Sequence, residues 1–444
     1  ILTYRKEYSA HFVTMNQTQE PGSVHEIIIT FEGSPVESTN PPWDGGFIWK
    51  KDINQKPFLA NANQLLGSSS WLPSKDIPYD EPDQGIQISI TAPSPLVSVS
   101  NGRLIEHDAN TYTWKVINPI NGYGISINTG DYVHFKESYA GEKGPLDLDY
   151  YVLSYNIEKA KKQFTQVPKM LEAFEYWFGP YPFYEDGFKL VEAPYLGMEH
   201  QSSVTYGNGF ENGYLGGDLS STGEGLKFDF IIIHESGHEW FANSLTNYDV
   251  ADMWIHEGFT TYSEVLYLDY HFGSVSGNRY MVGLRDRISN TNPVTGVYQV
   301  NQRGSDDMYF KGAAMIHTLR QVLDNDDKFR ELLRGINKTF YHQTLSSDQL
   351  ENYIIQQTAL DLKGFFDQYL RSTKVPTVEY KNKNGIFKYC FKNTVNDFTI
   401  PVRFFIDDKE VWLNPSKEWQ KLTLPSETST IRIDENFYID FLKK

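Results

Sequence analysis

The feature that most constrains this chain is an apolar run that ends in two histidines, FIIIHESGH, over residues 230–238. His234 and His238 are four positions apart, so on a helix both imidazoles lie on one face, about one turn apart. Glu235 lies beside them. Two imidazoles and a carboxylate are costly to bury in an apolar helix without partners. A metal ion satisfies them most simply, and neutral imidazole is a preferred ligand of zinc.

A zinc site needs a third protein ligand, and Glu257 is the candidate. It follows His238 by nineteen positions, which lets the first helix end, the loop over residues 243–253 turn, and a second helix present the carboxylate. Three protein ligands leave a fourth position for water, as in catalytic sites. The pattern predicts one catalytic Zn²⁺ per chain. The alternative is a helix whose two histidines are satisfied by local hydrogen bonds.

Composition narrows the class of protein around such a site. The chain has 444 residues, 40% hydrophobic and 15% aromatic, which predicts two or three well-packed domains. A net charge of −17 disfavours nucleic acid and anionic membranes as partners. No apolar run approaches the roughly 18 residues of a membrane-spanning helix. Cys390 is the only cysteine, which excludes an internal disulfide and a cysteine-rich metal site.

The start of the chain bears on its location. It begins at Ile1, without an initiator methionine or a signal-like segment. Together with the single cysteine, this favours an extracytoplasmic location, periplasmic or secreted, over a cytoplasmic one. The sequence leaves the oligomeric state open.

The pattern along the chain predicts three domains and a multidomain α+β fold. Residues 1–147 alternate short Val-, Ile- and Tyr-rich runs, including residues 23–33, with Gly, Pro and Asn, which is typical of an antiparallel β domain. Residues 148–375 show mainly helical spacing. Residues 376–444 return to β, with Asn384-Gly385 as a hairpin turn.

Within the middle region, we expect a helix over residues 155–179 that is interrupted near Pro168. Another helix is expected over residues 226–245, the stretch that carries both histidines. A third begins near Gly258, and a fourth covers residues 306–323, where acidic residues favour its start.

Four motifs, in matching order, resemble the zinc aminopeptidases of the aminopeptidase N type (gluzincins). They are H-E-x-x-H with the glutamate of WIHEG (residues 254–258), LGMEH (residues 196–200), YFKGA (residues 309–313), and ANQLLGSSSWLPSKD (residues 62–76). The resemblance covers most of the chain. It implies a thermolysin-like, mainly helical zinc domain between an N-terminal β domain that lacks its first strands and a small C-terminal β-sandwich-like domain.

The resemblance also implies an activity: hydrolysis of the N-terminal residue from peptides with a free N-terminus. Zinc would polarise the scissile carbonyl and lower the pKa of its water. Glu235 would act as general base and then acid. Tyr309 would stabilise the oxyanion.

The resemblance assigns substrate-binding roles to other residues. Glu199 matches the amine-binding glutamate, and Gln64 matches a second position that contacts the amine. The backbone of Gly197 and Met198 would lie beside the substrate like an added strand. Glu264, seven residues after Glu257, is expected to orient a zinc histidine, or else to be a surface charge.

The chain also departs from the family pattern. His200 replaces the usual Asn and Leu196 the usual first Gly, which puts the preferred N-terminal residue in doubt. Ser74 replaces a Cys. The large helical C-terminal domain of many members is missing, so the site is expected to be more open or closed by a partner chain.

Three other functions compete with this interpretation. The same scaffold serves as an epoxide hydrolase or bifunctional enzyme in some family members. A non-catalytic binding protein would have lost at least one of five residues that are all present: His234, Glu235, His238, Glu257 and Tyr309. A zinc endopeptidase is disfavoured by Glu199, since a carboxylate there penalises a blocked or continuing chain.

Overall fold

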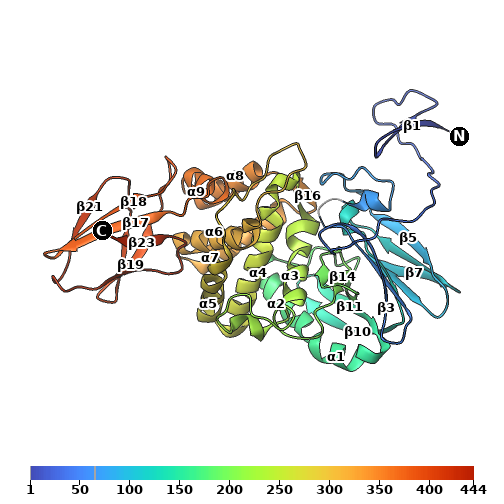
Figure 1. The fold of residues 1–444 in the computed structure, drawn as a ribbon, viewed down its shortest axis with the longest axis horizontal. Helices are drawn as coiled ribbons and strands as arrows, with labels where there is room; N and C mark the ends of the chain where they lie inside the picture. The colour runs from blue at the N-terminus through green and yellow to red at the C-terminus, as the bar shows by residue number, and fades with distance from the viewer. Residues whose placement is uncertain (1, 65–66) are drawn as a thin grey trace. The chain divides into compact units, whose positions relative to one another are not determined.

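The computed structural model describes residues 2–64 and 67–444 (Figure 1). Contacts divide the chain into two units, Ile1–Ser34 and Pro35–Lys444. The first unit contains the hairpin of β1 (Thr3–Glu7) and β2 (Ala10–Thr14). The strand predicted over residues 23–33 is wrong: within the described chain this segment pairs with no strand, and Ile28 is 84% exposed. A β-prone run forms a strand only where a neighbouring strand takes its backbone hydrogen bonds.

The second unit begins with two antiparallel sheets, as the β-rich pattern predicted. Their strand orders are β3-β4-β9-β6 and β5-β8-β7. The bounds are β3 (Gly46–Lys51), β4 (Pro57–Ala62), β5 (Ile86–Thr91), β6 (Val97–Ser100), β7 (Arg103–Asp108), β8 (Thr111–Val116) and β9 (Ile127–Gly130). Phe58, Val99 and Trp114 form part of the core between them. Gln64 follows the end of β4.

A five-stranded mixed sheet joins this region to the helices. It contains β10 (Tyr132–Gly141), β11 (Gly144–Leu153), β12 (Phe188–Glu192), β14 (Val204–Tyr206) and β13 (Gly197–Met198), in that order. β11, β12 and β14 run parallel, and the remaining pairs are antiparallel. The domain boundary predicted at residue 147 falls inside β11, and the division into three domains stays a prediction.

The helices form the middle of the chain. They are α1 (Ile157–Gln163), α2 (Gln166–Phe178), α3 (Phe230–Gly237), α4 (Trp254–Phe272), α5 (Ser274–Leu284), α6 (Asp307–Leu323), α7 (Asp326–Thr339), α8 (Ser347–Thr358) and α9 (Lys363–Leu370). The predicted interruption separates α1 from α2. Pro168 lies in the first turn of α2, where a missing N–H costs nothing.

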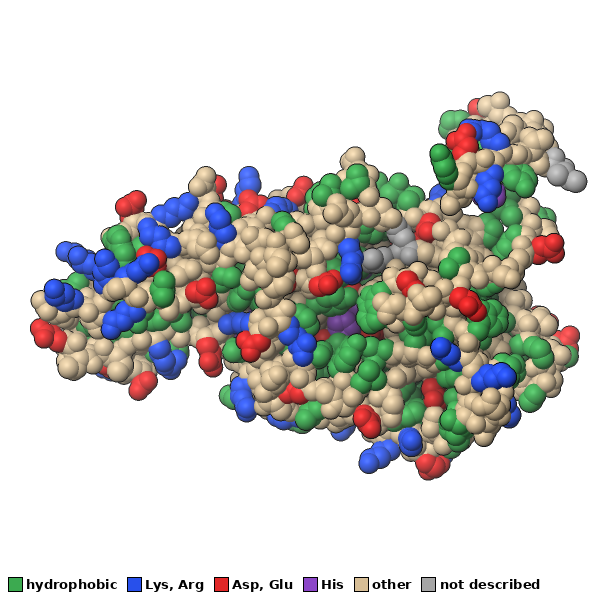
Figure 2. Space-filling model, in the orientation of Figure 1, with side chains coloured by type: hydrophobic (Ala, Val, Ile, Leu, Met, Phe, Trp, Pro, Cys, Tyr) green, Lys and Arg blue, Asp and Glu red, His purple; other side chains and the backbone are tan. Residues whose placement is uncertain are grey.

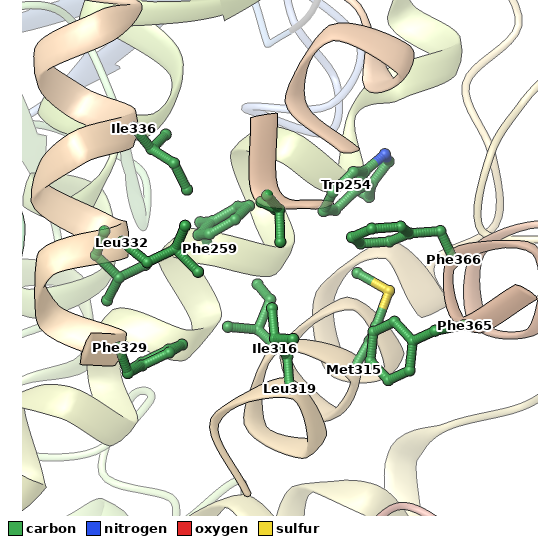
Figure 3. A pocket seen from close by; sticks show the side chains of 12 residues that line it. Trp254, Phe259, Met315, Ile316, Leu319, Phe329, Leu332, Ile336, Phe365 and Phe366 are labelled. Carbon is green, nitrogen blue, oxygen red and sulfur yellow. The ribbon is translucent and has the colours of Figure 1, made fainter. Parts of the chain in front are cut away.

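The core of the helical region is apolar and tightly filled. Figure 3 shows side chains of α4, α6, α7 and α9 converging on a small cavity, among them Trp254, Met315, Leu332 and Phe366. Every residue that lines this cavity is hydrophobic. A cavity without polar partners offers nothing to hold a charged substrate or a metal, so it is a packing defect of the core.

The C-terminal residues form two facing sheets, as the predicted β-sandwich-like domain requires. Their orders are β21-β18-β17-β23 and β20-β19-β22. The bounds are β17 (Thr377–Lys383), β18 (Ile386–Lys392), β19 (Val402–Ile406), β20 (Lys409–Leu413), β21 (Gln420–Thr423), β22 (Ile431–Ile433) and β23 (Asp440–Lys443). Asn384 and Gly385 form the predicted hairpin turn, with φ of 51° and 69°.

Candidate active site

Helix α3 begins where an aspartate caps it. The Asp229 side chain accepts hydrogen bonds from the backbone N–H groups of Ile231 (3.1 Å) and Ile232 (3.3 Å). The Tyr206 hydroxyl also donates to this carboxylate (2.7 Å). The cap starts the helix at Phe230 and orients its histidine face. An N-cap Asp directly before an apolar run was readable from the sequence.

The expected helix over residues 226–245 is wrong at both ends. α3 ends at Gly237, and a turn over Glu239–Ser244 leads into β15 (Leu245–Asn247), which pairs with β16 (Gln343–Leu345). Phe241 and Ala242 have non-helical backbones, and Ala242 has φ 157° and ψ −54°. This conformation is unfavourable for a residue with a Cβ. The apolar periodicity continues through the turn, so it does not reveal the kink.

Glu257 lies on α4, which begins at Trp254 and not near Gly258 as expected. Its Oε2 is 3.6 Å from His234 Nε2 and 3.4 Å from His238 Nε2. Zinc bonds of about 2.0–2.1 Å in tetrahedral geometry put two ligand atoms about 3.3–3.4 Å apart. Within the described chain, this buried Oε2 accepts no hydrogen bond. The three side chains therefore fit a zinc ion.

The other nitrogen of each histidine has an oxygen partner. His234 Nδ1 lies 2.7 Å from Glu264 Oε1, and His238 Nδ1 lies 3.1 Å from the Phe241 carbonyl. A carboxylate or carbonyl only accepts, so both Nδ1 atoms carry the proton and both Nε2 lone pairs face the proposed metal. Tyr280 donates to the second oxygen of Glu264 (2.5 Å). Glu264 is thus a buried orienting residue, not a surface charge.

Two further carboxylates, of Glu199 and Glu235, lie beside the three side chains that fit a zinc ion. Ligand atoms of Glu199, Glu235 and His238 lie within 4.8 Å of one another. Burial raises the pKa of Glu235 to about 7 and also raises the pKa of Glu199. Figure 2 shows histidine surface recessed near the middle of the face that it draws. The candidate site residues themselves are almost completely buried, with His234 6% and Glu235 8% exposed.

The loop that carries Glu199 is held by the turn after α3. Asn243 Nδ2 donates to the backbone carbonyl of Glu199 (2.9 Å), and Glu239 accepts from the Ser202 N–H (2.8 Å). The same turn supplies the Phe241 carbonyl to His238. One kinked segment therefore positions a zinc ligand and the loop of the second carboxylate. Nothing in the local sequence pattern singles out Asn243.

Gln64 and Tyr309 meet on the other side of the site. Gln64 Nε2 donates to Glu257 Oε1 (3.3 Å) and to the Tyr309 hydroxyl (3.4 Å). Burial raises the pKa of the Tyr309 phenol well above its usual value. Leu65 and Leu66, within the motif that carries Gln64, lie outside the described residues.

Gly197 and Met198 form β13, the edge strand of the mixed sheet. Gly197 has φ 157°, and a Cβ there would lie 2.8 Å from the Ile231 side chain, so only glycine fits. Within the described residues, the edge of β13 away from β14 pairs with no other strand, while the Met198 carbonyl accepts from the His200 N–H (3.0 Å) and from Thr205 Oγ1 (3.1 Å). His200 is buried, with Nδ1 2.9 Å from Thr205 Oγ1.

Two glycines set the distance between α4, which carries Glu257, and α6, which carries Tyr309. A Cβ added at Gly312 would lie 3.0 Å from Gly258 Cα. We expect Gly312→Ala to push the helices apart, because backbone atoms cannot yield as a flexible side chain does. The variant should lose about 1–3 kcal/mol of unfolding free energy. Its kcat should fall as Tyr309 withdraws from the zinc ligands.

Urea denaturation and peptide hydrolysis measure the two effects. Gly335→Ala on α7 is the control, because its new Cβ would meet mainly the movable hydroxyl end of Tyr353. If Gly312→Ala retained both stability and kcat, the glycine contact would not set the helix spacing.

Among the described residues, none of the helices has the length and apolar character to span a bilayer.

Comparison with known proteins identifies the domain that holds the site. The model of the Peptidase family M1 domain matches residues 162–369, which include both histidines, Glu257 and Tyr309. The probable aminopeptidase 2 of Sulfurisphaera tokodaii is 21% identical over 414 residues, which cover 87% of this chain and 51% of that protein. Aminopeptidase B of Homo sapiens is 25% identical over 348 residues, which cover 72% of this chain and 50% of that protein. The chain spans about half the length of these relatives.

Solved structures share the fold. A mutant M1 zinc metallopeptidase from Deinococcus radiodurans aligns with a TM-score of 0.67 at 19% identity, over 84% of this chain and 82% of that one. A mutant M1 zinc metallopeptidase from the same organism, bound to a Tyr-Ser-Ala substrate, aligns with a TM-score of 0.65 at 18% identity. The alignment covers 82% of this chain and 80% of that one. The multidomain α+β fold expected from the sequence is confirmed.

Proposed function

Because the chain belongs to peptidase family M1, the gluzincin zinc metallopeptidases, we propose that it is an aminopeptidase that hydrolyses the N-terminal residue from peptides. The observation that carries the proposal is one buried cluster with two parts: three converging side chains that could hold zinc, and beside them the carboxylate of Glu199. The first supplies hydrolysis and the second supplies recognition of a free amine.

His234, His238 and Glu257 would hold the zinc ion. When bound, zinc supplies Lewis-acid chemistry, which polarises the scissile carbonyl and makes water a better nucleophile near neutral pH. The remaining steps belong to side chains of this chain.

Glu235 acts as the proton carrier. Its carboxyl is 8% exposed, and burial raises its pKa to about 7. A group with this pKa accepts a proton from the attacking water and returns it to the departing amine near neutral pH. An aspartate or glutamate at its usual pKa would hold the proton too weakly for the second step.

Tyr309 stabilises the oxygen of the scissile carbonyl as it becomes negative. Its raised pKa keeps the phenol protonated, so it remains a donor throughout the reaction. Gln64, which donates to both Tyr309 and Glu257, fixes the phenol beside the zinc ligands.

Glu199 selects the end of the substrate. It is 2% exposed, and the loop that carries it is held by Asn243. A carboxylate and an ammonium group form a charge-assisted hydrogen bond, which is stronger than a bond between neutral groups. It also disfavours a substrate whose chain continues in place of the amine. The substrate backbone would run along the free edge of β13.

A matched pair of peptides tests the proposal. One peptide has a free N-terminus and the other is acetylated; both are incubated with the zinc-loaded protein and analysed by mass spectrometry. We expect stepwise loss of single residues from the free peptide only. A zinc chelator should abolish it, and added zinc should restore it. Equal cleavage of the acetylated peptide would indicate an endopeptidase, and no cleavage of either would exclude peptides of that sequence as substrates.

A further inference from the structure

The outer face of sheet β21-β18-β17-β23 carries rows of lysines. Strand register puts Lys381 opposite Lys388, and Lys388 opposite Lys421, so three lysines lie side by side across three strands. Lys383, two residues after Lys381 on β17, and Lys392, four residues after Lys388 on β18, lie on the same face. All five are exposed. These five residues are the lysine face. Figure 2 shows blue side chains gathered over the C-terminal module.

The opposite face of this sheet accounts for the folding of the module. Phe387 packs against Phe404 of the second sheet, with ring centroids 6.0 Å apart. The lysine face therefore has no part in the core. Strands are about 4.7–4.9 Å apart, and like charges directly opposite each other destabilise a sheet. The repulsion between these lysines costs stability, and the lysines add nothing to the apolar core in return.

Acidic residues neutralise part of this charge: besides the acids at register positions, Glu418 lies close to Cys390 of the same face. By register, the described residues of the face include two acids, Glu379 and Asp440, and Glu379 pairs with Lys444 (3.0 Å). Residues 376–444 contain eleven basic residues (Lys and Arg) and ten acidic ones (Asp and Glu). The whole chain contains 40 basic and 57 acidic residues. The module is thus nearly neutral overall, its sheet face is cationic, and the rest of the chain is strongly acidic.

We propose that the lysine face binds an acidic polysaccharide, a linear glycan that carries repeated carboxylate or sulfate groups. A row of ammonium groups at strand spacing complements a row of anions on an extended polymer. The half-exposed indole of Trp419 borders the face, with Lys381 Nζ 5.0 Å from its ring, and offers an apolar surface to the C–H groups of a sugar.

The charge distribution and the shape of the face distinguish this partner from other polyanions. A broad anionic surface such as a membrane would also meet the acidic remainder of the chain and be repelled by it. Single-stranded nucleic acid is bound by several aromatic side chains that stack successive bases. By register, the described strand positions of this face are lysine, small, polar or aliphatic residues, and Trp419 lies at the border.

Binding to heparin, a sulfated polysaccharide, and to polygalacturonate, a carboxylated one, tests the proposal by isothermal titration at several salt concentrations. The test variant is Lys381→Gln/Lys388→Gln/Lys421→Gln, and we expect at least about a tenfold weaker affinity with a salt slope lower by about two. Its melting temperature should stay or rise, because like-charge repulsion is removed.

The matched control is Lys159→Gln/Lys161→Gln/Lys162→Gln, which removes the same charge from three exposed lysines of α1. It should bind like the unmodified protein. Equal weakening by both variants would overturn the proposal, as would no binding to either glycan. The proposal would also be overturned if the protein bound single-stranded oligothymidylate, or vesicles containing phosphatidylglycerol, more tightly than either glycan. The lysine face would then be assigned to that class of partner.

Discussion

Glu235→Gln should lower kcat about 10²–10⁴-fold, the range for loss of a general acid–base group. Gln has nearly the shape of Glu and remains neutral, so the three zinc ligands keep their positions. The substrate ammonium still meets Glu199, and KM should therefore change little. Hydrolysis of a free peptide gives kcat and KM, and metal analysis of the purified variant should show that zinc is retained.

Glu331→Gln, on the exposed surface of α7, is the matched control for this substitution. It makes the same chemical change and should leave kcat unaltered. Retention of kcat within a factor of about ten by Glu235→Gln, with zinc present, would remove Glu235 as the main proton carrier.

Glu199→Gln should mainly raise KM, whereas Glu235→Gln should mainly lower kcat. The buried carboxylate is the group proposed to pair with the substrate ammonium, and leaving one partner of a buried pair uncompensated costs about 3–5 kcal/mol. The kcat/KM for a free peptide should fall about 10²–10³-fold, mainly through KM. The acetylated peptide, which has no ammonium, should be cleaved no worse than before.

The split between KM and kcat for the free peptide is the informative measurement, since a general loss of structure also lowers kcat. Glu331→Gln again provides the control. If Glu199→Gln kept the full preference for the free peptide, recognition of the amine would have to be assigned to another group, with Gln64 as the first to be tested.

The chemistry of the site was predictable from local spacing. His234 and His238 share a helix face because residues four apart always do, and Glu257 needed only a second element to bring it back. In the structure, the ligand atoms of these three side chains lie within 4.8 Å of one another, and Glu235 and Glu199 lie beside them. The β-α-β pattern and the hairpin at Asn384-Gly385 were predictable for the same reason, since they depend on residues close in sequence.

Contacts between distant segments were not predictable. The sequence gives no sign that α3 ends at Gly237, because the turn through Phe241 and Ala242 is as apolar as a buried helix. The isoleucine-rich segment over residues 23–33 has strand propensity, yet it lacks a partner within the described chain. Propensity is local, whereas the hydrogen bonds that decide between helix, turn and strand come from elsewhere in the chain.

The sequence by itself determined which side chains have the chemistry of a zinc site, because that depends on residue type and on the helical repeat that puts His234 and His238 on one face. The amine-binding role predicted for Glu199 came from the resemblance to the aminopeptidases. Only the tertiary structure decided which nitrogen of each histidine faces the site. That choice depends on Glu264, thirty residues after His234, and on the Phe241 carbonyl, which the kink directs toward His238. It also joined Gln64 to Tyr309 across 245 positions. Such contacts depend on packing, and packing is a property of the whole chain.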